Sequence, residues 1–284
     1  MRVSDLNIDR VYVNSVQRSP EYHMVENHYH YYYECFYVRH GLARFFVNNS
    51  LCDLHSGDMI IVPPREVHFN KYLSNTIRIN IYFNESDLLH NGQPYFSDLE
   101  TRLLRLVMVH TPSAYIEKIE HTIDDMLSEE KTDDENTPEM MELLLKQFFL
   151  NVSRYGIFHY DLSANTPEED SDMLVAARYI KEHFSEHITL SSLADMAGLT
   201  PAYFSRKFTQ VTGMGMKEYL SYVRLQSAAQ ELRSTDHKIT EIAINCGFSD
   251  SNYFKDAFRK MYGVSPREYR KNRGKTDEIL AGTL

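Results

Sequence analysis

The sequence predicts a chain of several domains, in which an all-β barrel or sandwich and a helical hairpin precede an all-α domain. Three observations support this prediction. Residues 8–83 contain short runs rich in Tyr, Val, Phe and Ile, separated by Gly, Asn, Asp and Pro, which is typical of closely spaced strands. From residue 97 the apolar period becomes helical. Residues 193–269 then contain two similar helical segments, and a length of 284 residues suits about two domains.

Composition and charge exclude some classes of protein and favour others. No stretch approaches the roughly 18 consecutive apolar residues of a membrane span, and the N-terminus has no apolar region typical of a signal peptide. The three cysteines are widely spaced, which suits reduced thiols in the cytoplasm. Residues 1–170 carry 14 basic and 27 acidic side chains, whereas residues 171–284 carry 16 and 13. Such asymmetry marks the second segment as the one able to bind a polyanion.

The candidate strands of the first domain, residues 1–96, are short. They cover residues 34–39, 43–48, 58–62 and 77–83. In the last of these, isoleucines alternate with Arg78, Asn80 and Tyr82, so one face of the strand is apolar and the other is polar. Many short strands at this spacing favour a barrel or sandwich.

Residues 97–160 predict a helical hairpin with two narrow apolar seams. The first seam has steps of three and four residues and contains Ile116, Ile119, Ile123 and Met126. The second has steps of four and three and contains Met141, Leu145, Phe148, Val152 and Tyr155. Two roles are open and do not exclude each other: the hairpin covers the barrel, or it forms a dimer contact.

The polar, acidic segment 161–171 is predicted to be a linker, followed by a helical domain over 172–273 and a tail over 274–284. Segments 193–219 and 242–269 of this domain nearly repeat each other. The matching pairs include Ala194 with Ala243, Gly198 with Gly247, Phe204 with Phe254, Phe208 with Phe258 and Tyr219 with Tyr269. Two copies indicate a duplicated module.

Each copy has the pattern of a helix-turn-helix. A short helix ends at Gly198 or Gly247, where glycine permits the left-handed backbone of a tight turn between crossing helices. Thr200 provides an N-cap for the next helix, and Ser249 or Asp250 caps its equivalent. The outward residues near the start of both second helices are small, polar or basic, which suits a helix that enters the major groove.

These motifs resemble the AraC/XylS family of bacterial transcription regulators. Both copies end in Gly-x-x-x-(Lys/Arg)-Glu-Tyr, and the most specific stretch is KITEIAINCGFSDSNYFKDAFRKMYGVSPREYR at 238–270. The resemblance covers residues 171–273. It implies two helix-turn-helix units joined by one long helix, here about 215–234, whose recognition helices enter successive major grooves about 34 Å apart.

The resemblance also implies which side chains contact DNA. The base readers would be Ala202, Ser205 and Arg206 in the first unit and Ser251, Asn252 and Lys255 in the second. The phosphate contacts would be Lys207, Arg259, Lys260, Arg270 and Lys271. Arg206 is the best candidate, because a guanidinium can bond O6 and N7 of guanine together. Asp256 departs from the family pattern, and it either accepts from cytosine N4 or weakens the second unit by repulsion.

Four side chains of the first domain have the composition of a metal site. His28, His30 and Glu34 would share one face of an extended strand, and His68 follows on what looks like the partner strand. Three imidazoles and a carboxylate suit a divalent metal such as Zn, Mn, Fe or Ni. The other interpretation is that these residues hydrogen-bond to one another or to a polar ligand.

The same segment resembles a cupin, the jelly-roll barrel that senses sugars in AraC-type regulators. HYHYYYECFYVRHG (28–41) and GDMIIVPPREVH (57–68) look like the two cupin motifs, although Arg65 stands in place of a glycine. The resemblance implies an all-β cupin barrel with a ligand site formed by His30, Glu34, His40, His68, Asn70, Arg78 and Asn80. The alternative is that the polar face of 77–83 faces solvent.

Together these features predict a cytoplasmic, homodimeric transcription regulator that is not an enzyme. It would bind double-stranded DNA and a small effector, a carbohydrate, and it would contact RNA polymerase if it activates transcription. No membrane contact and no required cofactor are expected, while a divalent metal in the cupin stays open. Two other functions stay open as well: a metal-dependent cupin enzyme fused to a DNA-binding domain, and a dimeric regulator without a ligand.

Overall fold

The computed structural model describes residues 10–22, 30–48, 50–90, 93–94, 102–162 and 170–271. The chain divides into two compact units, Met1–Pro167 and Glu168–Leu284, so the division falls within the predicted linker 161–171. Residues 163–169 of that linker and the whole predicted tail 274–284 lie outside the described residues. Within the described ranges, no helix has the length and apolar character needed to cross a membrane.

The first unit contains a six-stranded antiparallel sheet that faces a smaller sheet. The order of the large sheet is β1 (Tyr12–Arg18), β7 (Thr76–Phe83), β2 (Tyr33–His40), β5 (Asp58–Val62), β10 (Val107–His110) and β11 (Ile157–His159). The small sheet has the order β4 (Ser50–His55), β3 (Leu42–Val47) and β6 (His68–Tyr72). β8 (Leu89–His90) and β9 (Gln93–Pro94) pair separately. The four predicted strands are present, with ends shifted by at most one residue.

The alternation within β7 decides which side chains line the barrel. Ile79 and Ile81 pack into a core that also contains residues of the helices. Asn80 pairs in register with Phe36, and Phe36 belongs to a second core built from both sheets. The polar face of β7 therefore lies on the interior side, between the two sheets.

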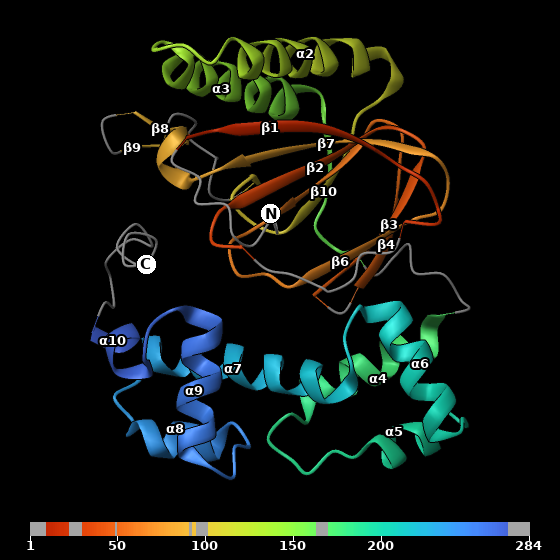
Figure 1. Ribbon diagram of the computed structural model, residues 1–284, viewed down its shortest axis with the longest axis vertical. Coiled ribbons are helices and arrows are strands. Elements are labelled where there is room, and N and C mark those ends of the chain that lie inside the picture. Colours follow the sequence, from red (N-terminus) through yellow and green to blue (C-terminus); the bar gives the residue numbers. More distant parts are fainter. Residues whose placement is uncertain are drawn as a thin grey trace. The chain divides into compact units, whose positions relative to one another are not determined.

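Helices α2 (Ile116–Thr132) and α3 (Thr137–Tyr155) cover the outer face of the large sheet, as Figure 1 shows; the short 3-10 turns η2 (Glu85–Leu88) and η3 (Ser113–Tyr115) precede them. The predicted seams supply the contact, with Ile119, Ile123, Met126, Met141, Leu145, Phe148 and Val152 all buried. These seams therefore serve to cover the barrel.

The prediction that residues 97–160 form only a helical hairpin is wrong for two segments. β10 and β11 lie within this range, and both belong to the large sheet, where β10 pairs with β5 and β11 with β10. A strand of four or three residues is too short to display an alternating period. Their extended conformation therefore depends on partners far away in the sequence.

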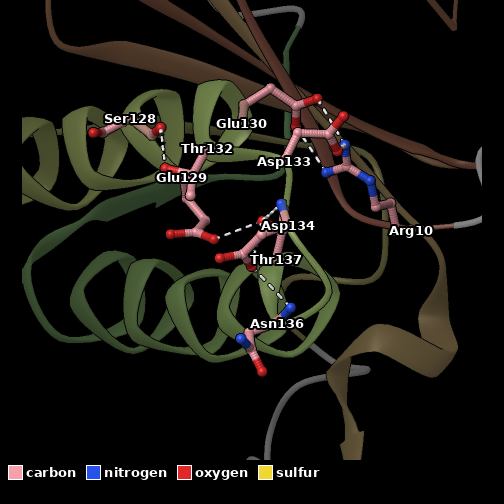
Figure 2. A network of polar contacts seen from close by, with 9 residues as sticks. All are labelled: Arg10, Ser128, Glu129, Glu130, Thr132, Asp133, Asp134, Asn136 and Thr137. Atoms are coloured by element: carbon pink, nitrogen blue, oxygen red, sulfur yellow. Dashed lines mark hydrogen bonds and ion pairs between the residues drawn. The ribbon is translucent and has the colours of Figure 1, made fainter.

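Polar side chains hold the turn between α2 and α3 (Figure 2). The hydroxyl of Thr137 donates to a carboxylate oxygen of Glu129 at 2.8 Å. The guanidinium of Arg10, just before β1, donates to Glu130 at 3.1 Å and to Asp133 at 3.0 Å. Part of the acidic run 128–136 thus ties the end of α2 to the start of the sheet.

The second unit consists of helices: α4 (Ser171–Glu182), α5 (Leu190–Met196), α6 (Pro201–Thr212), α7 (Met216–Ser234), α8 (Ile239–Asn245), α9 (Ser251–Tyr262) and α10 (Pro266–Lys271). α5 and α6 form the first helix-turn-helix, and α8 and α9 form the second. α7 joins them, as Figure 1 shows, close to the range expected for the long connecting helix.

The turns of the two units follow the sequence pattern. Gly198 and Gly247 both have left-handed backbones, with φ of 66° and 82°. Thr200 caps α6 by accepting from the N–H of Tyr203, and Asp250, not Ser249, caps α9. The phenylalanine pairs of both second helices are fully buried, so the opposite faces of α6 and α9 are left to solvent.

Candidate ligand site and nucleic-acid interface

Polar side chains line the interior of the barrel. Six of the seven predicted ligand contacts come from or directly precede β2, β6 and β7 and lie between the two sheets, namely His30, Glu34, His68, Asn70, Arg78 and Asn80. Burial of so many polar groups is costly unless each of them finds a partner. The side chains of the interior are therefore suited to hydrogen bonds with one another or with a polar ligand.

His40 is a correction to the predicted set. Its side chain is exposed at the end of β2, outside the interior. The register of β2 against β7 shifts between Val38 and His40, so the alternation that directs Glu34, Phe36 and Val38 inward does not extend to His40. A bulge of this kind cannot be read from spacing in the sequence.

Glu34 is the centre of a buried cluster. Its Oε2 lies 2.9 Å from Nε2 of His30 and 3.2 Å from Nε2 of His68, and Asn80 donates to its Oε1. Burial alone would raise the pKa of Glu34, but the hydrogen bonds and charges of both histidines outweigh burial and hold it well below the usual value. Burial lowers the pKa of His30, and Glu34 opposes this effect only in part.

The orientation of both histidine rings is fixed by backbone carbonyls. Nδ1–H of His30 donates to the carbonyl of Tyr32 at 2.7 Å, and Nδ1–H of His68 donates to the carbonyl of Glu66 at 3.0 Å. In a neutral imidazole this tautomer leaves a lone pair on Nε2. Both lone pairs would face the Glu34 carboxylate, so a proton or a metal cation belongs between them.

The donor set therefore fits a divalent metal. One ligand atom from each of His30, Glu34 and His68 lies within 4.8 Å of the others, and carbonyl-bound Nδ1 atoms are the usual outer contacts of metal-binding histidines. His28, the fourth predicted ligand, lies outside the described residues.

Arg65 occupies the position at which the second cupin motif has a glycine. Its backbone is left-handed, with φ of 64°, which is the conformation that a glycine there would adopt without strain. Its N–H donates to the carbonyl of His30 at 2.7 Å. The turn before β6 is thus held against the segment that carries the first histidine of the cluster.

Other interior atoms have no partner among the residues that the structure describes. These buried atoms include Oδ1 of Asn70, Oδ1 of Asn80, and Nε and Nη1 of Arg78. Leaving a buried polar group unpaired costs about 1–3 kcal/mol. These atoms come from both sheets, Asn70 from β6 and the others from β7, and are suited to hydrogen bonds with a molecule bound between them.

The second unit exposes the predicted base readers near the starts of α6 and α9. Ala202 and Arg206 on α6, and Asn252 and Lys255 on α9, are exposed, while Ser205 and Ser251 are half-buried. The phosphate candidates Arg259, Lys260 and Lys271 are exposed and Arg270 is half-buried. Asp256 is exposed beside Lys255 and adds a negative charge to this surface.

Lys207, one of the predicted phosphate contacts, is paired within the second unit. Its ammonium lies 2.9 Å from a carboxylate oxygen of Asp172 on α4, and this hydrogen bond raises the pKa of Lys207. The side chain is partly covered and holds α6 against α4. A contact between residues 35 positions apart cannot be predicted from a local sequence pattern.

The sequence did not single out two further exposed side chains. Tyr203 and Tyr253 occupy equivalent positions on α6 and α9 and are 48% and 58% exposed. The sequence contains a signal for these two residues, because a tyrosine precedes the buried phenylalanine in both copies. In the barrel, Arg18 and Tyr72 were not predicted; β1, which carries Arg18, was not among the candidate strands, and only His68 and Asn70 of β6 were named.

Comparison with known proteins agrees with both units. The AraC-like ligand binding domain model matches residues 15–147, and the model of a helix-turn-helix domain matches residues 193–272. The HTH-type transcriptional activator RhaS of Enterobacter sp. (strain 638) is 25% identical over 252 residues, which is 87% of each chain. RhaS of Escherichia coli O157:H7 is 24% identical with the same coverage.

Solved structures are similar to parts or to most of the chain. The C-terminal domain of AraT, a response regulator from Geobacillus stearothermophilus, is 37% identical, with 38% of this chain and 89% of that chain covered and a TM-score of 0.36. ToxT from Vibrio cholerae is 15% identical, with 94% and 100% covered and a TM-score of 0.38. The two matched family models lie in different units and account for both of them. The chain therefore belongs to the AraC/XylS family of DNA-binding transcription regulators, with an AraC-like ligand-binding domain before its pair of helix-turn-helix units.

Proposed function

We propose that this regulator binds a sugar or a sugar derivative inside its barrel and that binding changes transcription from a DNA site read by α6 and α9. The observation that carries the proposal is the pair of buried amide oxygens of Asn70 and Asn80, which have no hydrogen-bond donor among the described residues. Hydroxyl groups of a carbohydrate supply such donors. The interior also offers aromatic faces, since Tyr32 stacks on His30 with ring centroids 4.5 Å apart.

The DNA-reading part of the proposal assigns base contacts to Ala202, Ser205, Arg206, Ser251, Asn252 and Lys255. Each recognition helix begins at a capped N-terminus and has exposed small, polar or basic side chains in its first turns. Side chains at this end of a helix reach base edges when the helix lies in the major groove. The relatives named RhaS are transcriptional activators, which supports a contact of this chain with RNA polymerase.

The melting temperature of the intact protein against a panel of sugars, with and without a chelator, tests the sensor. A ligand at about 100 times its Kd should stabilise the protein by roughly 2.7 kcal/mol, a shift of several degrees. We expect Asn70→Ala to weaken binding at least tenfold and His40→Ala, a matched change at the exposed end of β2, to leave it intact. Absence of a shift with every sugar would favour a regulator that uses its barrel only to dimerise.

A divalent metal is a second candidate occupant of the barrel. His30, Glu34 and His68 would hold it, and it would balance the buried charge and polarise a ligand hydroxyl. We infer that sugar binding itself requires no metal, so the sugar shift should survive the chelator. Elemental analysis of the purified protein and of Glu34→Gln tests the site: one metal per chain in the parent and none in the variant supports it, whereas a metal-free parent argues against it.

We also propose that the chain forms a homodimer through α3. Its inward seam is used by the barrel, but Met140, Leu143 and Leu150 form a second apolar line, with exposed fractions of 44%, 60% and 40%. Their steps of three and seven residues suit packing against a second copy of the helix. Leu143→Glu should therefore give a monomer in light scattering with an unchanged barrel melting temperature. His121→Glu, an exposed change on α2, should remain dimeric, and a dimeric Leu143→Glu protein would contradict this interface.

A further inference from the structure

The interior of the barrel has two chemically different ends. Glu34 and its two histidines occupy one end, where Glu34 pairs in register with Tyr82 of β7. Arg78 lies four residues before Tyr82 on the same strand, roughly 13 Å away at the usual rise per residue. The long side chain of Arg78 spans part of this distance and hydrogen-bonds to Tyr82, but its Nε and Nη1 still have no acceptor among the described residues.

A second arginine, Arg18 of β1, lies on the same face of the sheet. Arg78 pairs with Val16 and Arg18 pairs with Thr76, so the two arginines are diagonal neighbours on adjacent antiparallel strands. Diagonal neighbours have Cα atoms about 7–8 Å apart, which long side chains bridge easily. Both guanidinium groups can thus reach one bound group.

Tyr72 of β6 closes this end of the interior from the opposite sheet. Burial raises the pKa of its hydroxyl, and the charges of Arg78 and Arg18 oppose that effect, so both guanidiniums lie near it. Arg18 also lies over the ring of Tyr22, 4.3 Å from its centroid, and Tyr22 contacts Tyr72 edge to face. The side chains of Arg18, Arg78 and Tyr72 therefore lie at the same end of the interior.

Neither arginine has a carboxylate partner within ion-pair distance in the part of the chain that the structure describes. Nε of Arg18 and both Nε and Nη1 of Arg78 are buried without a hydrogen-bond acceptor there. Burial would lower the pKa of Arg78, but Tyr72, Tyr82 and Glu34 raise it, so the guanidinium keeps its charge. Arg18 is half-buried, and its Nη1 donates to the carbonyl of Gln17 at 3.3 Å. Two guanidiniums at one end of the interior without a carboxylate partner are costly, and an anion reduces that cost.

Resting on the sensor function proposed above, we propose that the effector is an anionic polyhydroxylated molecule, a sugar acid or a sugar phosphate. Its anionic group binds between Arg18 and Arg78, with Tyr72 as a hydroxyl donor. Its hydroxyls donate to the amide oxygens of Asn70 and Asn80, each two residues from Tyr72 or Arg78 on the same strand face. One ligand then satisfies both the donors and the acceptors that the fold leaves unpaired.

Calorimetric titration of the full-length protein with matched ligands tests the proposal. Each set contains a neutral sugar, its uronate and its 6-phosphate, such as galactose, galacturonate and galactose 6-phosphate. We expect an anionic member to bind at least tenfold more tightly than its neutral parent, with the advantage shrinking as salt is added. The carboxylate and phosphate arms identify which anion is preferred.

Variants separate the anion site from the rest of the interior. Arg18→Gln and Arg78→Gln should each weaken binding of the anion at least tenfold and leave binding of the neutral parent nearly unchanged. Arg39→Gln is the control, since Arg39 belongs to the same sheet but pairs with Asp124 of α2 at 2.7 Å. Arg78→Met should raise the melting temperature of the ligand-free protein, because it removes an interior charge that has no carboxylate partner among the described residues; an arginine whose role is its hydrogen bond to Tyr82 would give a lower one.

The outcomes distinguish the two proposals. A neutral sugar that binds as tightly as its anionic partners, with no effect of the arginine variants, overturns the anion site and leaves the sensor function standing. Failure of every neutral and anionic ligand to bind overturns both.

Discussion

Asp87 is a buried carboxyl group whose ionisation opposes folding. It lies in the 3-10 turn that follows β7 and accepts a hydrogen bond from the N–H of Asn84 at 2.7 Å. Burial raises its pKa to about 6, against the effect of that hydrogen bond. The unfolded chain, with a carboxyl pKa of 3.8, loses this proton at lower pH than the folded chain.

We therefore expect the free energy of unfolding to fall as the pH rises from about 4 to 6, because the folded state binds more protons in that interval. Asp87→Asn keeps the acceptor for Asn84 and removes the charge. It should be more stable than the parent at pH 7 by up to about 3 kcal/mol and equally stable near pH 4. Urea unfolding across this range measures the difference. Glu139→Gln, an exposed change on α3, should track the parent, and a pH profile of Asp87→Asn parallel to that of the parent would contradict the assignment.

Arg206 carries the clearest prediction for DNA reading. Arg206→Ala should lose about 1–3 kcal/mol of binding free energy at the cognate site, because a bidentate contact with guanine disappears. Arg206→Lys keeps the charge but not the forked geometry, so it should lose specific affinity while binding random duplex as well as the parent does. Anisotropy titrations with cognate and random DNA give both values. Unchanged cognate binding by Arg206→Ala would reject the base-reading role.

At the scale of elements, the two helix-turn-helix turns have the same sequence logic but different surroundings. A Cβ at Gly198 would have no atom within 4 Å, whereas a Cβ at Gly247 would lie 2.9 Å from the carbonyl oxygen of Phe184 and from Nε of Arg224. Those two atoms form a hydrogen bond of 2.7 Å that joins α7 to the loop after α4. The second turn is therefore part of the packing of the whole unit.

Because the two turns differ only in their surroundings, alanine substitutions at Gly198 and Gly247 can be compared directly. Gly198→Ala should cost about 1–2 kcal/mol of stability, which is the strain of a left-handed alanine. Gly247→Ala should cost clearly more, since the Phe184 carbonyl must also move and its bond to Arg224 is disturbed. Urea unfolding of the two full-length variants measures both values. Equal losses would show that the Phe184–Arg224 contact does not constrain the turn.

The elements also show which parts of the fold can be predicted from local sequence patterns. The helices of the second unit were predictable because caps, turn glycines and phenylalanine stripes act within one or two turns of chain. Strands β10 and β11 were not, because their three or four residues become extended only by pairing with one another and with β5. The α2 and α3 seams were predictable, but what they contact depended on the sheet beneath them.

At the scale of the molecule, charge is divided along the chain. Residues 1–170 have 13 more acidic than basic side chains, and residues 171–284 have three more basic than acidic ones. Phosphate contacts should therefore come from the second unit alone.

The dependence of DNA affinity on salt checks this division. The slope of log affinity against log salt counts the phosphates that a protein neutralises. The full chain and the fragment Glu168–Leu284 should have the same slope on the same duplex. A steeper slope for the full chain would mean that basic residues of the first unit also contact DNA.

The sequence by itself determined the two helix-turn-helix units, their caps, the helical hairpin and the polar face of β7. All of these depend on interactions between residues close together in the chain. The tertiary structure alone decided that His40 lies outside the barrel, that Asp172 pairs with Lys207, and that Arg18 and Arg78 are diagonal neighbours on the strand face that Tyr72 faces. These outcomes depend on strand register, on a bulge and on contacts between distant elements, and the free energy of such pairings is set only when the sheets and helices pack together.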